Sequence, residues 1–396
     1  MNRALASRGF AALVAAGTLG LGGCDEKVLI DIDNVAPDVE ITSPTDGDNV
    51  SGVSFLVEIT ATDDVGVDRV EVEVGGVPGP VATTAPYRLL VVTLGLTAGN
   101  ELALVVRAFD TSGNSSTASA SLTVSGRTVT RLTNHPNSDR NPAWSPDGDR
   151  IVFQAKRDGD QFDLWTMDAD GLNAARLTQN VNEDRNPAWS PDGEWIAFDS
   201  DRAGGFDLWR LPLTGGEAAA ESLTFGNNSD VEPAWSPDGA RLYFASDRGT
   251  IGDFNIWRVP AAGGNASQVT SLLQAERAPA ISPDGATLAF VSPVGFNEPH
   301  VYTTAIGSQE FAPLTGDVGF TEADPAWAPV GRVVLYGRDD GVDSNVWALL
   351  VGDDTPLQAT FGSGTLGDGG AAFSPDGSKI AFHSDRDGNL EIYVLE

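Results

Sequence analysis

Six acidic residues occupy one position of a repeated segment. Each stands three residues before a copy of PAWSPDG or a close variant, and successive acids are 45 or 46 residues apart. They are Asp139, Asp184, Asp230, Glu276, Glu322 and Asp368. If the repeats close into a ring, these carboxylates form a candidate ligand-binding ring on one face, where their fields add and attract a cationic ligand. Alternatively, each carboxylate caps backbone N–H groups or pairs with a following arginine, at Arg140, Arg185 or Arg277.

Residues suited to catalysis are sparse. The chain has only three histidines, and no G-x-S-x-G segment of the kind that presents a nucleophilic serine. The histidines are His135, His300 and His383. His383 precedes Ser384-Asp385-Arg386, but neighbouring residues of a strand point to opposite faces. The same SDR triplet recurs at 200–202 and 246–248 without histidine, so we expect its Asp and Arg to pair within the repeat. We therefore expect no catalytic residues, no metal site and no cofactor.

The repeated segments also define the architecture. Each PAWSPDG copy is followed by an apolar run such as IVFQA, an aromatic run such as DLWTM and a short run such as ARLT. This pattern predicts four strands in each of six units. A four-stranded sheet of this size cannot bury both faces alone, whereas radial stacking packs each face on a neighbour. Residues 127–396 are therefore expected to form a six-bladed β-propeller, with the repeated tryptophans packed between blades.

The last unit lacks its fourth strand. Only three strand-like runs follow Gly370, which would leave an unpaired edge that invites aggregation. Residues 128–133 match the outer-strand pattern but precede the first unit. We expect this segment to pair beside residues 391–395 and so to close the ring.

An all-β region precedes the repeats. Residues 37–125 contain alternating runs such as VEVEV and LVVRA, separated by turn clusters, which predicts an antiparallel sandwich. The segments ITSPTDG, ATDDVGV and RAFDTSGNSS resemble bacterial immunoglobulin-like domains, which implies a spacer or adhesive module. Four acids in its turns are candidates either for calcium binding or for capping the turns. They are Asp63, Asp64, Asp68 and Asp110.

The first 36 residues have the features of a targeting segment and a tether. Arg3 and Arg8 precede a short apolar run that ends in Leu-Gly-Gly-Cys24. This ending resembles the bacterial lipobox, which implies a signal peptide over 1–23, a diacylglycerol on Cys24 and a tether over 24–36. Cys24 is the only cysteine, so it cannot form an internal disulfide. The alternative is an ordinary secretory signal with an incidental cysteine.

The overall charge excludes some classes of partner. The chain has 24 Lys and Arg against 56 Asp and Glu, a formal net charge of −32. Such a surface repels nucleic acid and anionic lipid, so we expect no nucleic-acid partner and contact with a membrane only through the lipid anchor.

The repeats themselves carry a family resemblance. The segments PAWSPDG, IAF, SDR and DADG are similar to the repeats of the TolB C-terminal propeller. In two respects the chain departs from TolB: its preceding domain resembles an immunoglobulin domain, and its N-terminus resembles that of a lipoprotein. We expect a lipid-anchored protein of the bacterial cell envelope, on its periplasmic or outer-surface side, whose propeller face recruits an envelope protein or a basic peptide. The alternative is a glycan-binding or polysaccharide-lyase-like protein.

Overall fold

The computed structural model describes residues 33–250, 253–272, 274–295, 298–330, 332–362 and 366–396. The expected signal segment, Cys24 and most of the expected tether lie outside the described residues. Contacts between residues divide the chain into two units. The first contains the described residues up to Asp48 together with Val57–Leu89 and Glu101–Leu122, and the second contains Asn49–Leu56, Leu90–Asn100 and Thr123–Glu396.

The N-terminal region consists of two sheets. Its residues alternate between buried and exposed positions, most regularly along β7, as expected when one face of a sheet packs in a core and the other meets water. The smaller sheet has the order β1 (Asp38–Ser43), β3 (Ser54–Thr62), β6 (Tyr87–Val92). The larger has the order β2 (Asn49–Val50), β8 (Ser115–Val124), β7 (Glu101–Asp110), β4 (Val67–Val74), β5 (Val77–Ala82). The expected sandwich is confirmed.

The repeats form four-stranded antiparallel sheets, one for each repeat, which we number as blades 1 to 6. Blade 1 contains β10 (Asp139–Trp144), β11 (Arg150–Ala155), β12 (Asp163–Asp168) and β13 (Ala175–Arg176). Blade 2 contains β14 (Asp184–Trp189), β15 (Trp195–Ser200), β16 (Asp207–Pro212), the short 3-10 helix η1 (Glu217–Ala219) and β17 (Glu221–Ser222). Blade 3 contains β18 (Asp230–Trp235), β19 (Arg241–Thr250), β20 (Asp253–Pro260) and β21 (Ser267–Gln268).

The second half of the ring repeats this order. Blade 4 contains β22 (Arg277–Ile281), β23 (Thr287–Ser292), β24 (His300–Ala305) and β25 (Ala312–Pro313). Blade 5 contains β26 (Thr321–Trp327), β27 (Val333–Asp339), β28 (Ser344–Leu350) and β29 (Leu357–Gln358). Blade 6 contains β30 (Asp368–Phe373), β31 (Ile380–Ser384), β32 (Glu391–Leu395) and, from far earlier in the chain, β9 (Val129–Arg131).

The blades close into a ring around their first strands. Each first strand contacts the first strand of the next blade, and β30 of blade 6 contacts β10 of blade 1. Large aromatic side chains fill the second strand of every blade at one repeat position and are fully buried. They are Phe153, Phe198, Phe244, Phe290, Tyr336 and Phe382. Neighbouring blades thus bury each other's faces, which a single sheet could not do.

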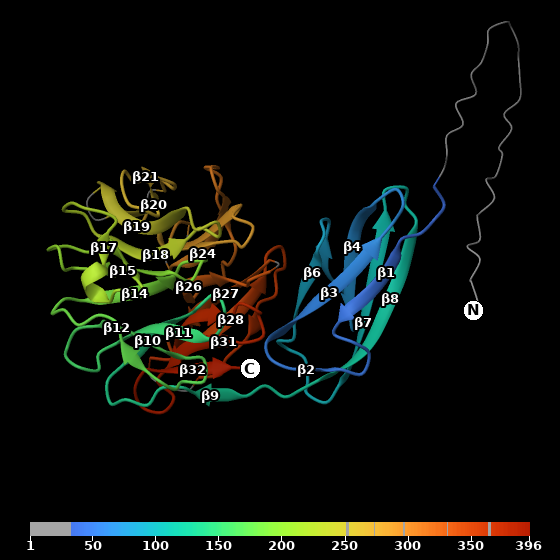
Figure 1. Cartoon of the computed structure of the whole chain (residues 1–396), viewed down its shortest axis with the longest axis horizontal. Helices are drawn as coiled ribbons and strands as arrows, with labels where there is room; N and C mark the ends of the chain where they lie inside the picture. Colours follow the sequence, from blue (N-terminus) through green and yellow to red (C-terminus); the bar gives the residue numbers. More distant parts are fainter. Residues whose placement is uncertain (1–32, 251–252, 273, 296–297, 331, 363–365) are drawn as a thin grey trace, which may run out of the picture. The chain divides into compact units, whose positions relative to one another are not determined.

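The expected closure of the ring is confirmed. Strand β9 pairs antiparallel with β32, with Arg131 opposite Tyr393 and Val129 opposite Leu395 (Figure 1). The first strand-like segment of the propeller therefore completes its last sheet. Since β9 covers the edge of β32, that edge is not left open to other chains. Among the described residues, no helix is both long and apolar enough to cross a membrane.

Candidate binding channel of the propeller

The first strand of every blade contains an irregularity two residues after the repeated acid. The register against the second strand shifts there, as between Arg140 and Ala143 in blade 1. The residue at the shift has a positive φ of 49° to 60° in all six blades. These bulge residues are Asn141, Asn186, Glu232, Ala278, Asp324 and Gly370. Proline follows the bulge in blades 1 to 5, where the missing N–H is tolerated because this strand forms the inner edge of its sheet.

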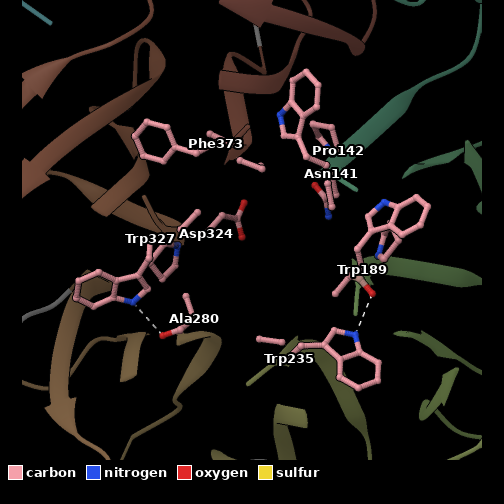
Figure 2. Close-up of a pocket in the computed structure, with 18 of the residues that line it drawn as sticks. Asn141, Pro142, Trp189, Trp235, Ala280, Asp324, Trp327 and Phe373 are labelled. Carbon is pink, nitrogen blue, oxygen red and sulfur yellow. Dashed lines mark hydrogen bonds between the residues drawn. The ribbon is translucent and has the colours of Figure 1, made fainter. Parts of the chain in front are cut away.

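The inner strands enclose a cavity of about 470 Å³. Its wall consists mainly of the proline, alanine and tryptophan residues of the PAW segments. Polar side chains enter it at four bulge positions, Asn141, Asn186, Glu232 and Asp324. Figure 2 shows the Asp324 carboxylate and the Asn141 amide pointing into this space. The channel is therefore an apolar tube with a few polar groups at one level, which is the usual composition of a ligand pocket.

Several polar side chains behind the channel wall, or at its bulges, accept hydrogen bonds from the bulge of the next blade. The N–H of Asn186 donates to Gln154 Oε1 (2.7 Å), and that of Glu232 donates to Asp199 Oδ1 (3.1 Å). In blade 3 the second strand has alanine at the position equivalent to Gln154 and Asp199. There the side chain of the bulge residue accepts the hydrogen bond instead. The N–H of Ala278 donates to Glu232 Oε2 (2.7 Å). The N–H of a bulge residue is therefore satisfied by an acceptor of the preceding blade, either on its second strand or at its own bulge.

Burial shifts the pKa values of several groups around the channel. It raises the pKa of Asp324 to about 6; the charge of Glu232 raises it further, and a hydrogen bond from the N–H of Gly370 partly offsets both. Burial also raises the pKa of Asp199 to about 6, against hydrogen bonds from Asn186 and Glu232. Loss of hydration thus raises the pKa of a carboxylate that lines the channel and of one that is buried behind it.

The six acids of the candidate ligand-binding ring do not line this channel, and the placement expected from the sequence needs correction. All six are at most 1% exposed, and the cavity is lined instead by the bulge residues two positions later. They are Asp139, Asp184, Asp230, Glu276, Glu322 and Asp368. The bulge turns the chain between the two positions, so a carboxylate at the first faces the interior of the blade. Their binding of a ligand stays a prediction that this geometry does not favour.

Four of these acids pair with an arginine eighteen residues later. Arg157 reaches Asp139 at 2.6 Å, and Arg202 reaches Asp184 at 2.8 Å. The pairs Arg248–Asp230 and Arg386–Asp368 repeat this arrangement. The partners expected from the sequence, Arg140, Arg185 and Arg277, are therefore wrong. Each pairing arginine also stacks on aromatic rings, which buries the cation beside its anion.

This arginine belongs to the SDR triplet in blades 2, 3 and 6, and it pairs within its own repeat, as expected, with the acid at the start of the blade. The aspartate of the triplet binds the preceding loop: Asp201 accepts the N–H of Glu183 at 2.9 Å, and Asp247 accepts that of Ser229 at 2.7 Å. The triplet thus holds both the loop before the blade and the buried acid at its start. The Asp and the Arg of one triplet thus bind adjacent residues, such as Glu183 and Asp184, which explains why they recur together.

Glu276 and Glu322 lack this arginine. Glu276 accepts hydrogen bonds from the Thr270 hydroxyl and, at 2.7 Å, from the N–H of Leu272. Glu322 accepts from the Thr315 hydroxyl and the N–H of Val301, and lies 3.2 Å from Nδ1 of His300. The capping role considered for the acids therefore applies mainly to blades 4 and 5.

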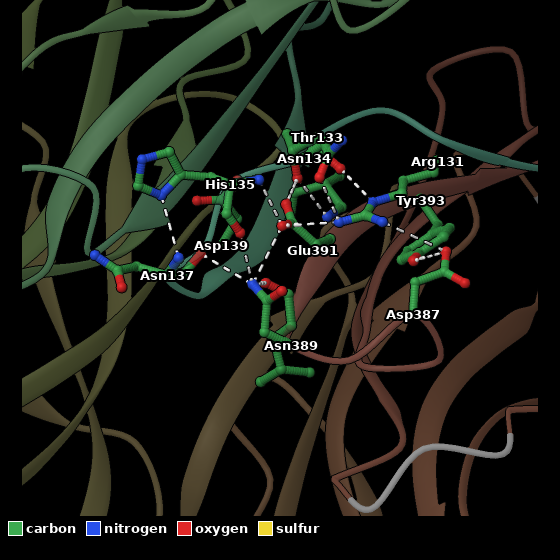
Figure 3. Close-up of polar contacts among 12 residues, drawn as sticks. Arg131, Thr133, Asn134, His135, Asn137, Asp139, Asp387, Asn389, Glu391 and Tyr393 are labelled. Atoms are coloured by element: carbon green, nitrogen blue, oxygen red, sulfur yellow. Dashed lines mark hydrogen bonds and ion pairs between the residues drawn. The ribbon is translucent and has the colours of Figure 1, made fainter.

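The closure of the ring has a polar network of its own (Figure 3). Glu391 accepts hydrogen bonds from Thr133 Oγ1 at 2.5 Å, from the N–H of His135 at 2.7 Å and from Arg131 Nη2 at 3.1 Å. Asn389 Nδ2 donates to the carbonyl oxygen of His135 at 2.9 Å. The buried carboxylate of the last blade is thus held by the segment that opens the propeller.

The three histidines do not form a catalytic group with the neighbouring serine. His383 accepts a hydrogen bond at Nδ1 from the N–H of Asn141 (3.4 Å), and burial lowers its pKa to about 3, so it stays neutral. Ser384 Oγ accepts instead from Arg386 Nε at 2.9 Å. His300 lies against Glu322, and His135 lies in the closure segment. His383 therefore supports the channel wall.

The repeated tryptophans pack between blades, as expected. Trp235 of blade 3 donates from Nε1 to the carbonyl of Ala188 in blade 2, and Trp327 of blade 5 donates to that of Ala280 in blade 4, each at 3.1 Å. Trp189 belongs to a buried cluster that contains residues of both blade 1 and blade 2. Their ring faces serve the core rather than a sugar-stacking surface.

The acids considered for calcium in the N-terminal region are only partly brought together. Asp63 and Asp64 lie near Asp33, with one oxygen of each within 4.8 Å of the others. Asp68 pairs with Arg69 at 3.0 Å, and Asp110 accepts the N–H groups of Ser112 and Asn114 at 2.8 Å. Asp110 therefore caps a turn.

The sequence analysis missed the bulge residues. Their signal was visible in the residue before each PAW segment, because Asn and Gly tolerate a positive φ better than most residues. That position reads Asn, Asn, Glu, Ala, Asp and Gly along the six repeats. The blades differ in charge at this position, and also at the one before it, which reads Arg, Arg, Val, Arg, Ala and Gly.

Comparison with known families agrees with this architecture. The TolB β-propeller domain matches residues 111–228 and 217–359, and a bacterial Ig domain matches residues 37–124. Because the propeller match covers more than half of the chain, the protein belongs to the family of proteins with TolB β-propeller domains.

Solved structures show the same fold at low sequence identity. A protein of Agrobacterium tumefaciens described as a TolB candidate is 20% identical, with a TM-score of 0.54 over 68% of this chain and 96% of its own. An oligogalacturonate lyase of Vibrio parahaemolyticus is 12% identical, with a TM-score of 0.48 over 68% and 93%. TolB of Acinetobacter baumannii is 15% identical, with a TM-score of 0.47 over 91% and 79%.

Proposed function

We propose that this protein is a non-catalytic lipoprotein of the bacterial cell envelope and that its propeller binds a protein partner. The channel takes up an extended peptide segment of that partner. The observation that supports this proposal is the cavity of about 470 Å³, with apolar walls and polar groups confined to the bulge positions. A volume of this size fits a few side chains of a peptide.

Anchoring at Cys24 completes the proposal. The basic n-region, the short apolar run and the Leu-Gly-Gly-Cys ending support it. Mass spectrometry of the mature protein is expected to find an N-terminal cysteine that carries acyl chains. The Cys24→Ser variant is expected to leave the membrane fraction, because an acidic protein surface is repelled by anionic lipid. Equal membrane binding of this variant would contradict the anchor.

Peptide binding in the channel is testable with introduced thiols. Because Cys24 is the only cysteine, the Cys24→Ser chain contains none. Asn141→Cys then places one thiol in the channel, and Val342→Cys places one on a blade 5 loop where the side chain is 80% exposed. Peptides are selected from a random display library on the cysteine-free protein. We expect bound peptides to protect the channel thiol from a maleimide and to leave the loop thiol reactive.

The outcomes separate the candidate functions. Equal protection of both thiols, or of neither, would contradict binding in the channel. The alternative of a polysaccharide-lyase-like protein predicts unsaturated products when the protein is incubated with polyuronides. Their appearance would contradict the non-catalytic proposal.

A further inference from the structure

We propose that the channel holds a cationic group of its bound segment, a lysine or arginine side chain or an N-terminal ammonium, between the carboxylates of Glu232 and Asp324. This inference rests on the proposed function, because it names the chemistry that the channel selects. The backbone conformation of the bulge is the same in all six repeats, whereas its side chains differ. These side chains would therefore determine the specificity of the channel.

The first support is the distribution of charge around the channel. Of the six bulge positions, only those of blades 3 and 5 carry carboxylates. Blade 4 lies between them and carries Ala278, which has no side chain beyond Cβ. The two carboxylates therefore flank a gap on one side of the channel, opposite the amides of Asn141 and Asn186, which hydrogen-bond to each other at 2.8 Å. A ligand meets negative charge on one side only.

The second support is the incomplete pairing of these carboxylates. Glu232 lies 3.2 Å from Arg277, whose side chain is 43% exposed, so solvent weakens this pair. Asp324 is in no ion pair of the described residues, although it is exposed to the cavity. The described lining contains no lysine, arginine or histidine. Among these lining residues a cation from outside meets no like charge, and Arg277 stands beside Glu232 outside the lining.

The third support is that the charges of the two carboxylates act on each other. The charge of Glu232 contributes to the raised pKa of Asp324, which means that the field of one acid reaches the other through the channel wall. A cation placed between them relieves this repulsion. Because the walls are proline, alanine and tryptophan, they also pack against the methylene stem of a lysine or arginine.

A divalent metal fits this place less well than an organic cation. Within the described part of the chain, the group of three carboxylates close enough to share a metal consists of Asp33, Asp63 and Asp64 of the N-terminal region. Two carboxylates without a third ligand give poor coordination for calcium, which takes six to eight oxygens. Binding is therefore expected to persist in the presence of a chelator.

The experiment compares two single-charge variants of the same blade. Asp324→Asn removes the channel charge and keeps an oxygen that can accept the N–H of Gly370. Glu322→Gln replaces a buried acid two residues earlier, outside the cavity lining. Peptides selected on the wild-type protein, and protected in the channel by the thiol test, are titrated calorimetrically against all three proteins with chelator present.

We expect these peptides to contain a basic residue or to require a free N-terminus. Replacement of that lysine by norleucine, or acetylation of that terminus, identifies the source of the cation. Asp324→Asn is expected to weaken binding about tenfold or more, whereas Glu322→Gln changes it less than about twofold. Affinity is also expected to fall as the pH drops below about 6, where Asp324 becomes protonated.

Each contrary outcome has one meaning. Peptides that occupy the channel but bind both variants and their neutral analogues equally would overturn the cation site and leave the proposed function standing. Binding that disappears with chelator would assign the site to a metal and would also overturn it. Failure of every selected peptide to protect the channel thiol would overturn the proposed function itself, and the inference with it.

Discussion

Blades 2 and 5 are copies of the same sequence repeat, but they stabilise their buried carboxylates in different ways. In blade 2, Asp184 pairs with Arg202, whose guanidinium lies 5.2 Å from the ring centre of Phe198 and 5.0 Å from that of Trp209. In blade 5, the residue eighteen positions after Glu322 is Asp340 instead of arginine. Glu322 is left with hydroxyl and backbone donors and with His300.

Blade 5 does contain an arginine nearby, but it is directed elsewhere. Arg338 pairs at 2.5 Å with Asp317, whose side chain is 64% exposed, and stacks 3.7 Å from the ring centre of Phe320. Glu322 Oε1 is buried without a hydrogen-bond partner among the described residues. Burial raises the pKa of Glu322 to about 7. The fold therefore tolerates a buried acid in two ways, by an internal cation or by a proton.

The difference shows what the repeat requires. The aromatic second strand and the threonine that follows the outer strand are kept in both blades, whereas the ion pair is not. Packing between blades is therefore the common requirement of the ring. The ion pair is a local solution for a carboxylate that packing has buried.

The largest expected effect is the loss of the internal cation in blade 2. Arg202→Ala leaves Asp184 buried and uncompensated, so we expect the free energy of unfolding to fall by about 3–5 kcal/mol. Urea unfolding followed by tryptophan fluorescence measures this, because all nine tryptophans lie in the propeller.

Lys379→Ala is the matched control for that prediction. Lys379 pairs with Glu396 at 2.5 Å in the same ring, but both side chains are 42% exposed, so the expected loss is only about 0–1 kcal/mol. Equal losses for the two variants would show that burial does not distinguish the pairs and would remove the basis of the comparison.

A smaller effect on stability is expected when the titrating group of blade 5, Glu322, is replaced by glutamine. Below about pH 4.5, Glu322 is protonated in both states, and between about 4.5 and 7 only the folded state holds the proton. The wild-type protein thus loses stability from this group as the pH rises through that range. Glu322→Gln does not titrate and is expected to be more stable than wild type above pH 7, by roughly 1–3 kcal/mol, with the difference vanishing near pH 4.5.

Glu276→Gln is the control in blade 4. Both oxygens of Glu276 accept hydrogen bonds, from Thr270 and from the N–H of Leu272, and an amide can replace only one of these acceptors. Burial raises the pKa of Glu276 as well, so the comparison is made at pH 7, where we expect this variant to be less stable than wild type by about 1–3 kcal/mol. A Glu322→Gln variant that is likewise less stable at pH 7 would mean that lost hydrogen-bond acceptors, rather than the titrating proton, decide the stability at Glu322.

The sequence predicted the elements of the ring well, because each depends on local patterns. The 45- or 46-residue period predicted a four-stranded sheet for every repeat, and the unmatched segment at residues 128–133 predicted the pairing of β9 with β32. Strand alternation and turn residues are short-range signals, and an open edge needs a partner wherever it lies in the chain. The sandwich before the repeats followed from the same signals.

The place where each side chain points was decided by the tertiary structure alone. The repeat showed that an acid occurs at one position in all six units, but a left-handed bulge residue two positions later determines which residue faces the channel. The arginines that neutralise four of the acids lie eighteen residues away in sequence and become neighbours only when the first and second strands pair. Composition and period are properties of the chain, whereas burial and charge pairing depend on what the closed ring brings together.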